Sequence, residues 1–181
     1  MHTETARLVI RTFAEADAEP WLALVNDPEV GRFLPPSEDA TLETFQSALK
    51  RRRAMEQERG YAMWAVVLKG TGALIGQCGL YPSGDDESEV ELAYHFITSC
   101  WGHGYGTEAA IAVHAHGLGQ IALDQVIALV MPENVGSCRV AERAAMRLEG
   151  LATYYGIPGL RKYVARREFW GDAQIASDAR L

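Results

Sequence analysis

The stretch Thr98 to Ala110 carries the pattern with the clearest chemical meaning, T-S-C-W-G-H-G-Y-G-T-E-A-A. Gly102, Gly104 and Gly106 alternate with other residues between a strand-like run and an apolar, helix-like run. Backbone N–H groups in the first turn of a helix lack partners within the helix and carry partial positive charge, which attracts anions. Glycines remove the side chains that would hold a phosphate away from those groups. The pattern predicts a phosphate-binding loop; an ordinary glycine-rich turn would contain the same residues.

The spacing of the glycines excludes two common nucleotide-binding motifs. A dinucleotide-binding fingerprint, G-x-G-x-x-G, would need a glycine where Thr107 stands. A P-loop, G-x-x-x-x-G-K-[ST], needs a lysine after its last glycine, and none follows here. The predicted phosphate is therefore part of another kind of ligand.

A second chemical candidate lies on the strand-like run that precedes the loop. Alternation places Glu91 and His95 on the same side of this strand, so a carboxylate and an imidazole could face one cleft. A carboxylate and an imidazole are the side chains that most often move protons in catalysis. The same alternation is also compatible with a paired or solvated glutamate and a satisfied sheet histidine.

A third candidate, Asn134 with Ser137, opens a helix after the apolar run Gln125 to Met131. Asparagine is a favoured N-cap, because its side chain accepts hydrogen bonds from the first-turn N–H groups. The residues alone leave two interpretations open, a helix cap and a ligand contact.

These motifs together resemble the GNAT N-acetyltransferases. The acyl-coenzyme A pyrophosphate loop of that family reads [QR]-x-x-G-x-[GA], and Trp101 to Gly106 fits it with Trp in the first position. The longer pattern W-G-x-G-Y-[AG]-T-E-A is similar to the RimJ/RimL-type ribosomal-protein N-terminal acetyltransferases. The subgroup motif N-x-x-S-x-[RK]-[VL]-x-E-[KR] is matched at Asn134, Ser137, Arg139, Val140, Glu142 and Arg143.

The resemblance implies a set of site residues and acetyl-coenzyme A as co-substrate, with no metal. It implies that Glu91 lines the acceptor side and that Ser137 lies near the thioester sulfur as the acid that protonates the thiolate, with Tyr155 as a weaker alternative. The implied catalytic residues are therefore Glu91, Ser137 and Tyr155. The implied coenzyme-binding residues are Ile97, Thr98, Trp101, Gly102, His103, Gly104, Tyr105, Gly106, Thr107 and Asn134.

The activity expected from the resemblance is acetyl transfer to a primary amine by direct attack. The acceptor is a peptide or protein N-terminus or a small-molecule amine, and the chain is expected to act as a monomer or homodimer.

Two alternatives to this activity stay open. Cys100 or Cys138 could carry the acyl group covalently, which would require a lowered thiol pKa. Alternatively, the chain could be a non-catalytic acyl-coenzyme A sensor or regulatory module.

Periodicity indicates the elements that must position these residues. Strands are expected at residues 7–13, 61–68, 73–81, 89–97, 125–131, 148–157 and 160–169, and helices at 15–26, 41–59, 105–117 and 134–148. The strands at 89–97 and 125–131 are expected to run parallel, and Pro158-Gly159 is expected to turn the last hairpin. In the second helix Leu42, Phe45 and Leu49 predict one buried stripe.

The order of these elements predicts a mixed α+β, GNAT-like fold. Its central twisted mixed sheet would have about six to seven strands flanked by about four helices. Residues 1–170 are expected to form a single acyltransferase domain, and residues 171–181 a C-terminal tail.

Composition bounds the partners and the location. The 181 residues carry a net charge of −7 and a hydrophobic fraction of 48%, as expected of a globular protein with little general affinity for nucleic acid. The three cysteines include no C-x-x-C pair, so neither a disulfide framework nor a zinc site is indicated. No apolar run approaches a membrane span and the N-terminus does not resemble a signal peptide, so we expect no membrane partner and a cytoplasmic location.

Overall fold

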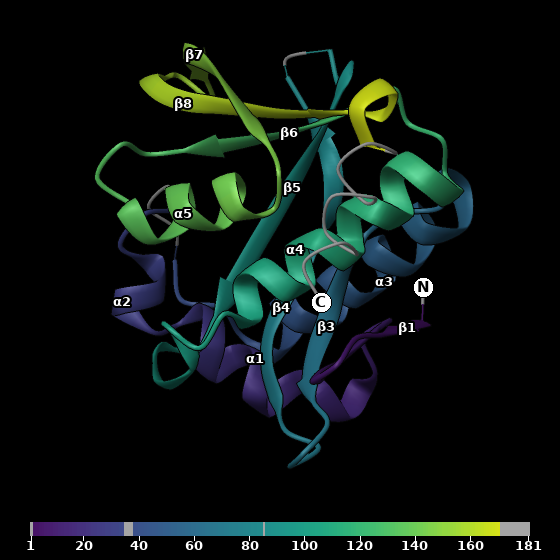
Figure 1. The fold of residues 1–181 in the computed structure, drawn as a ribbon. Coiled ribbons are helices and arrows are strands. Elements are labelled where there is room, and N and C mark those ends of the chain that lie inside the picture. The colour runs from purple at the N-terminus through teal and green to yellow at the C-terminus, as the bar shows by residue number, and fades with distance from the viewer. Residues whose placement is uncertain (1, 35–37, 85, 171–181) are drawn as a thin grey trace. The chain divides into compact units, whose positions relative to one another are not determined.

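The structure is a computed structural model that describes residues 2–34, 38–84 and 86–170 (Figure 1). The predicted tail, residues 171–181, lies outside the described residues. In the described part of the chain, no helix is both long and apolar enough to cross a bilayer.

The described strands form one mixed sheet in the order β1-β2-β3-β4-β5-β6-β8-β7. The predicted α+β class is confirmed, and so is the parallel pairing, in which Glu91 of β5 lies opposite Ile127 of β6. The strand that the sequence did not predict is β1, whose three polar residues have no hydrophobic alternation. The strand bounds are β1 His2–Glu4, β2 Leu8–Arg11, β3 Met63–Leu68, β4 Leu74–Ser83, β5 Glu89–Phe96, β6 Gln125–Val130, β7 Arg147–Tyr154 and β8 Ile157–Arg166.

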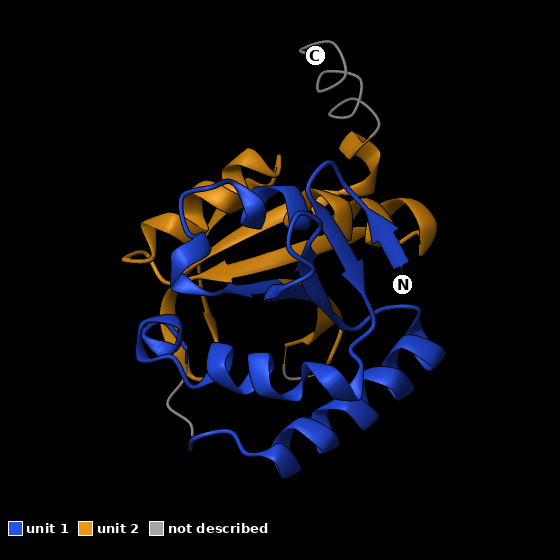
Figure 2. Cartoon of the chain, turned by 90° about the horizontal axis from the view of Figure 1, so that it is seen from below, with its two compact units in different colours: residues 1–79, 93–109 blue, residues 80–92, 110–181 orange. Residues whose placement is uncertain are grey.

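The chain divides into two compact units, coloured separately in Figure 2. The first unit comprises residues 1–79 and 93–109, and the second comprises residues 80–92 and 110–181. Strands β4 and β5 and helix α4 each contribute residues to both units. The glycine loop lies in the first unit and Glu91 lies in the second.

Two helices of the first unit, at residues 28–31 and 42–59, begin after polar residues whose side chains cap them. The Thr41 hydroxyl accepts a hydrogen bond from Thr44 N at the start of α3, and Gly60 ends that helix with a φ of 77°. A glycine is favoured there because a side chain resists the left-handed region. The helices and helical turns of this unit are η1 Glu15–Asp17, α1 Ala18–Val25, α2 Pro28–Gly31, α3 Leu42–Arg59, η2 Thr98–Cys100 and the start of α4 Tyr105–Ala115.

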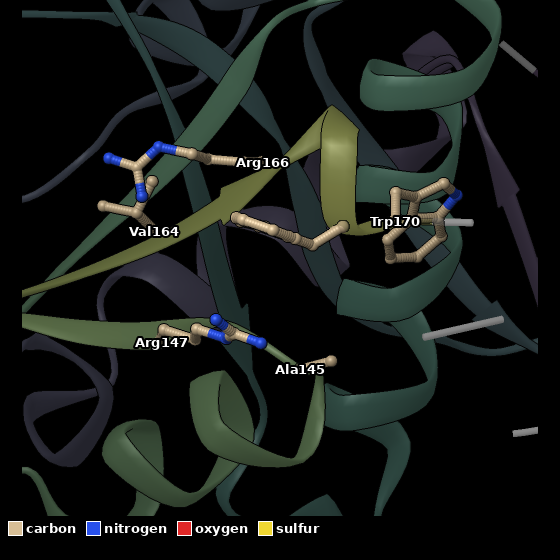
Figure 3. Close-up of a pocket in the computed structure, with 7 residues that line it drawn as sticks. Ala145, Arg147, Val164, Arg166 and Trp170 are labelled. Atoms are coloured by element: carbon tan, nitrogen blue, oxygen red, sulfur yellow. The ribbon is translucent and has the colours of Figure 1, made fainter. Parts of the chain in front are cut away.

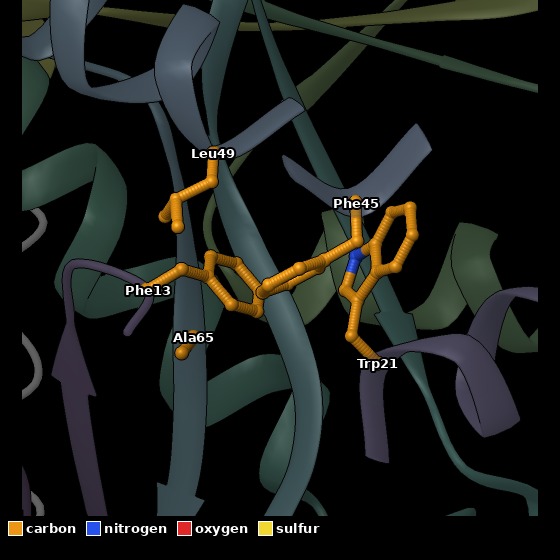
Figure 4. Close-up of a cluster of buried hydrophobic side chains, with 5 residues drawn as sticks. All are labelled: Phe13, Trp21, Phe45, Leu49 and Ala65. Atoms are coloured by element: carbon orange, nitrogen blue, oxygen red, sulfur yellow. The ribbon is translucent and has the colours of Figure 1, made fainter. Parts of the chain in front are cut away.

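The core of the first unit contains an aromatic cluster (Figure 4). The Trp21 and Phe45 ring centroids lie 5.4 Å apart, and the Phe13 ring meets Phe45 edge-on at 6.4 Å. Burying each such side chain stabilises the fold by about 1.5–3 kcal/mol. Phe45 and Leu49 confirm the predicted stripe of α3, but Leu42 is 54% exposed because it is the first residue of the helix.

The second unit joins α4, extended by a π-helical turn at His116–Gln120, to β6, α5 (Val135–Arg143), β7 and β8. The β7–β8 hairpin was predicted, but the position of its turn was wrong. Tyr154 pairs with Ile157, so Tyr155-Gly156 makes the turn while Pro158-Gly159 lies within β8. Glycine at position 156 has a φ of 72°, which permits the tight turn.

Candidate active site

Two glycines shape the loop between β5 and α4. Gly102 and Gly104 have φ values of 78° and 81°, in the left-handed region that other residues rarely adopt. A Cβ at Gly102 would meet nothing within 4 Å, and one at Gly104 would lie 3.4 Å from Arg7 Nη2. Gly106 is inside the first turn of α4. The glycines therefore both permit the backbone path and leave its N–H groups uncovered.

Main-chain donors are available along this loop. Within residues 2–34, 38–84 and 86–170, no protein acceptor receives the N–H groups of Thr98 or of residues 102–107. Glu108 N is the first N–H of α4 to find a partner, donating to Gly104 O at 3.1 Å. Such a row of N–H groups at a helix N-terminus is a site for an anion.

The ends of the loop are fixed to the sheet and to Arg7. Trp101 Nε1 donates to Phe96 O at 2.8 Å, and Ile97 N donates to Ile75 O at 3.0 Å. The indole that departs from the family pattern thus anchors the loop to the end of β5. Because Ile97 N already has an acceptor, Thr98 N is the available donor of the two.

Arg7 is a loop contact that the sequence did not reveal. Its Nη1 donates to His103 O at 2.9 Å, its Nε donates to Glu108 Oε2 at 2.7 Å, and its guanidinium carbon lies 4.5 Å from the Tyr105 ring centroid. The His103 and Tyr105 rings stack at 5.8 Å. Burial favours the neutral form of Glu108, but hydrogen bonds from Thr5 and Arg7 lower its pKa. Arg7 therefore joins β2 to the loop, with its charge paired to the Glu108 carboxylate in the first turn of α4.

In the second unit, Glu91 lies in a ring of hydroxyl groups. Its side chain is 5% exposed. Glu91 Oε2 accepts from Ser83 Oγ at 2.9 Å and from Tyr155 Oη at 2.7 Å, and the two hydroxyls lie 2.7 Å apart. The structure therefore brings together two of the predicted catalytic residues, Glu91 and Tyr155.

The Glu91 carboxylate has no cationic partner among the described residues. Burial raises its pKa, and the effect is opposed by hydrogen bonds from Tyr155, Tyr81 and Ser83 and from the backbone of Leu129. Burial likewise raises the pKa of Tyr155, so this phenol is neutral at physiological pH. A buried carboxyl group with a raised pKa is suited to accept a proton near neutral pH.

Two residues along β5, Glu89 makes a similar cluster with a different balance of charge. Lys162 Nζ donates to Glu89 Oε1 at 2.6 Å and to Tyr154 Oη at 2.8 Å. Tyr154 Oη in turn donates to Glu89 Oε2. Burial favours the neutral form of Glu89, but the bonds from Lys162 and Tyr154 lower its pKa. Glu89 is therefore held as an ion.

Asn134 and Ser137 meet at the start of α5. Asn134 Oδ1 accepts from Ser137 N at 3.0 Å, which confirms the N-cap interpretation. At the other end of α5, Ala145 adopts a φ of 61°. The helix therefore ends at Arg143, earlier than predicted, and alanine takes the left-handed conformation usually given to glycine.

His95 has its own partners in the first unit. Its Nδ1 lies 2.8 Å from Gln77 Nε2. Gln77 Oε1 accepts from Trp21 Nε1 at 3.0 Å and from Arg52 Nη2 at 2.9 Å, so the amide nitrogen is the donor to His95. Burial, with a smaller contribution from the charge of Arg52, lowers the pKa of His95 to about 4. This histidine is neutral at physiological pH and accepts a hydrogen bond through Nδ1.

Other features of the described residues lie apart from these clusters. Cys138 is buried and its Sγ lies 3.4 Å from Arg161 Nη1, whereas Cys100 is half-buried in η2. The described residues contain no group of three His, Cys, Asp or Glu side chains suited to a metal ion. A pocket in the second unit, shown in Figure 3, contains none of the predicted site residues and is lined by Ala145, Arg147, Val164, Ala165, Arg166, Phe169 and Trp170.

Sequence reasoning missed Arg7, Tyr81 and Ser83. A hairpin from β4 to β5 predicts that residues just before the turn lie near those just after it, so Ser83 could have been placed close to Glu91. Arg7 is about a hundred residues from the loop and carries no local signal.

Comparisons with known proteins identify relatives of the chain. A family model described as an acetyltransferase (GNAT) domain matches residues 7–147. YkkB of Bacillus subtilis (strain 168) is 31% identical over 154 residues, covering 78% of this chain and 83% of the relative. The N-acetyltransferase YoaA of the same organism is 26% identical over 152 residues, covering 84% of this chain and 86% of the relative.

Solved structures share the fold over nearly the whole chain. A GNAT-family acetyltransferase from Bacillus anthracis is 25% identical with a TM-score of 0.76, covering 93% of this chain and 99% of its own. RimL, a ribosomal L7/L12 alpha-N-protein acetyltransferase solved in complex with coenzyme A, is 17% identical with a TM-score of 0.77, covering 92% and 98%. The RimL likeness shows the fold alone.

Proposed function

Because the chain belongs to the GNAT acetyltransferase family and is an acyltransferase, we propose that it moves an acetyl group from acetyl-coenzyme A to a primary amine. The single observation that carries this proposal is the row of free N–H groups at Gly102 to Thr107. A pyrophosphate is the part of coenzyme A that such a row would bind. We also propose that residues 1–170 serve as one cytoplasmic acyltransferase domain.

The loop residues present fit a diphosphate. Gly102 and Gly104 leave the backbone uncovered, and the Arg7 guanidinium, bonded to His103 O, holds the loop in place. The proposed contacts are those inferred from the resemblance: Ile97, Thr98 and residues 101–107, with Asn134 on the pantetheine portion. RimL, whose structure contains coenzyme A, supports the ligand class by analogy.

Acetyl transfer requires a neutral amine and a stabilised oxyanion. A free α-amine has a pKa of about 8 and a lysine amine about 10.4, so the acceptor must lose a proton before it attacks. We assign this proton to Glu91, whose buried carboxyl has a raised pKa. Thr98 N is the proposed donor to the thioester oxygen. Ser137 is the proposed acid for the leaving thiolate, since the alternative acid, Tyr155, directs its hydroxyl proton at Glu91.

We propose a peptide or protein α-amine as the acceptor, with a small-molecule amine as the second candidate. RimL, a protein N-terminal acetyltransferase with the same fold, supports the first choice by analogy. Residues 27–39 and 153–160 are the segments in which we expect acceptor selection to lie. No nucleic acid or membrane partner is proposed, and the oligomeric state is a monomer or homodimer.

Thiol release from acetyl-coenzyme A tests the activity. The protein is incubated with acetyl-coenzyme A and a panel of peptides, amino acid derivatives, polyamines and aminoglycosides, and free coenzyme A is measured. Release that depends on an amine supports the transferase. Binding of acetyl-coenzyme A without release from any amine contradicts it and favours the sensor. A double Cys100→Ala, Cys138→Ala variant at full rate excludes an acyl-cysteine route.

The loop itself is tested by a pair of glycine substitutions. Gly104→Ala places a side chain at a φ of 81° beside Arg7, so we expect the KM for acetyl-coenzyme A to rise at least about 10-fold through lost phosphate contacts. Gly72→Ala is the matched control, because Gly72 has a φ of 70° in the β3–β4 turn and a Cβ added there would meet nothing within 4 Å. Equal effects of both variants on KM would contradict a binding role for the loop.

A further inference from the structure

The ring formed by Glu91, Ser83 and Tyr155 contains fewer protons than contacts. Three oxygen–oxygen contacts join Glu91 Oε2, Ser83 Oγ and Tyr155 Oη, at 2.9, 2.7 and 2.7 Å. When Glu91 is ionised, only the two hydroxyl protons are present to serve them, because each hydroxyl donates once. The Tyr81 hydroxyl also interacts with Glu91 and with Tyr155, adding one proton and two contacts. One further proton would therefore complete a hydrogen bond that the ionised ring lacks.

The three residues of the ring differ in their exposure to solvent. Glu91 and Ser83 are 5% and 1% exposed, whereas Tyr155 is 52% exposed. Tyr155 also holds a φ of 54°, a left-handed conformation that costs a non-glycine residue about 1–2 kcal/mol. The two-residue turn at Tyr155-Gly156 requires a positive φ at both positions, so the turn fixes the backbone from which the phenol reaches Glu91. Tyr155 is thus the member of the ring that an acceptor at the surface can reach.

We propose that the Tyr155 hydroxyl receives the proton of the acceptor amine and passes its own proton to Glu91. In this step the ammonium N–H bond breaks and a new O–H bond forms at Tyr155 Oη. The original Tyr155 proton moves to Glu91 Oε2, and the amine keeps its lone pair for attack on the thioester. Glu91 becomes a neutral acid, Tyr155 remains a neutral phenol, and Ser83 holds the two oxygens together. This proposal rests on the proposed function.

A tyrosine pair provides the experiment with its control. Tyr155→Phe removes only the hydroxyl that joins the surface to Glu91, and Tyr154→Phe removes the neighbouring hydroxyl that contacts Glu89. With acetyl-coenzyme A and the best amine of the panel, Tyr155→Phe is expected to lower kcat by about 10- to 100-fold while the KM for acetyl-coenzyme A changes less than about 2-fold. Tyr154→Phe should retain kcat within about 3-fold.

Measuring kcat in mixtures of water and heavy water distinguishes a proton-transfer role of Tyr155 from a purely structural one. If two protons move in one step, kcat of the wild type should depend on the deuterium fraction along a curve. Tyr155→Phe should show a smaller, linear dependence. Ser83→Ala keeps the direct Tyr155–Glu91 contact and should lower kcat by about 2- to 5-fold. Melting temperatures of all variants, measured in parallel, identify any loss caused by unfolding.

The outcomes distinguish proton transfer through Tyr155 from the acetyltransferase activity itself. A Tyr155→Phe variant that matches Tyr154→Phe in kcat and in its deuterium dependence would overturn the proposed proton transfer. If Glu91→Gln still lowered kcat in that case, the acetyl transfer and the role of Glu91 would stand. Absence of amine-dependent thiol release in the wild type would instead overturn the proposed function.

Discussion

Glu89 and Glu91 lie on the same strand and each bonds a tyrosine of the β7–β8 hairpin, but their pKa values are shifted in opposite directions. Glu89 with Tyr154 has Lys162 as a third partner, so an ionised carboxylate already has a proton for every contact. Glu91 with Tyr155 has Ser83 and Tyr81 instead, and when Glu91 is ionised the hydroxyl protons are fewer than the contacts among these groups. The pKa of Glu89 is lowered and that of Glu91 is raised. Deeper burial of Glu91 and the cation beside Glu89 thus separate a carboxylate suited to accept a proton from one held as an ion.

Replacing each glutamate by its amide should separate the two roles most strongly. Glu91→Gln keeps the shape but removes the proton acceptor, so we expect kcat to fall by about 10²- to 10⁴-fold with the KM for acetyl-coenzyme A nearly unchanged. Glu89→Gln should change kcat by less than about 5-fold, because its partners are Lys162 and Tyr154. Steady-state thiol release measures both. Equal losses of kcat in the two variants would remove the distinction.

Removing the cation should affect stability more than catalysis. Lys162→Met deletes two charge-assisted hydrogen bonds at a site where the Lys162 and Glu89 side chains are 21% and 17% exposed. We expect the free energy of unfolding to fall by about 1–3 kcal/mol, as measured by urea denaturation. A fall in kcat comparable to that of Glu91→Gln would show instead that the Glu89 cluster takes part in the reaction.

The two glutamates should give stability slopes of opposite sign with pH. The folded pKa of Glu91 lies above its ordinary value of 4.5, so the folded state holds the extra proton and this contribution to stability declines as pH rises above about 4.5. The folded pKa of Glu89 lies below 4.5, so its contribution is present above that pH and is lost as pH falls. Urea unfolding between about pH 3 and pH 7 should show that Glu91→Gln removes the first slope and Glu89→Gln the second.

Local patterns predicted most of the fold and part of the site. Alternation and caps located α3, α5 and every described strand except β1, because these depend on residues close in sequence. The loop glycines were recognisable because left-handed backbone at Gly102 and Gly104 needs that residue type. The Tyr155-Gly156 turn was misplaced by three residues toward Pro158-Gly159, since each dipeptide contains a glycine that can make a turn and only pairing with β7 decides between them.

What could not be predicted depends on long-range contacts. Periodicity placed Glu91 and His95 on one side of β5, but it could not tell that Glu91 bonds hydroxyls and His95 an amide. The contrast between Glu91 and Glu89 depends on Lys162, more than seventy residues away in the chain. Arg7 beside the glycine loop is a contact of the same kind.

The most direct test of the central claim is a ¹⁵N NMR titration of the protein with coenzyme A. We expect the amide signals of Gly102 to Thr107 to show the largest shifts and to saturate together, because no protein acceptor among the described residues receives these N–H groups. The amide of Gly72, in the β3–β4 turn, should not move. Saturable binding that leaves the signals of residues 102–107 unchanged would contradict the account.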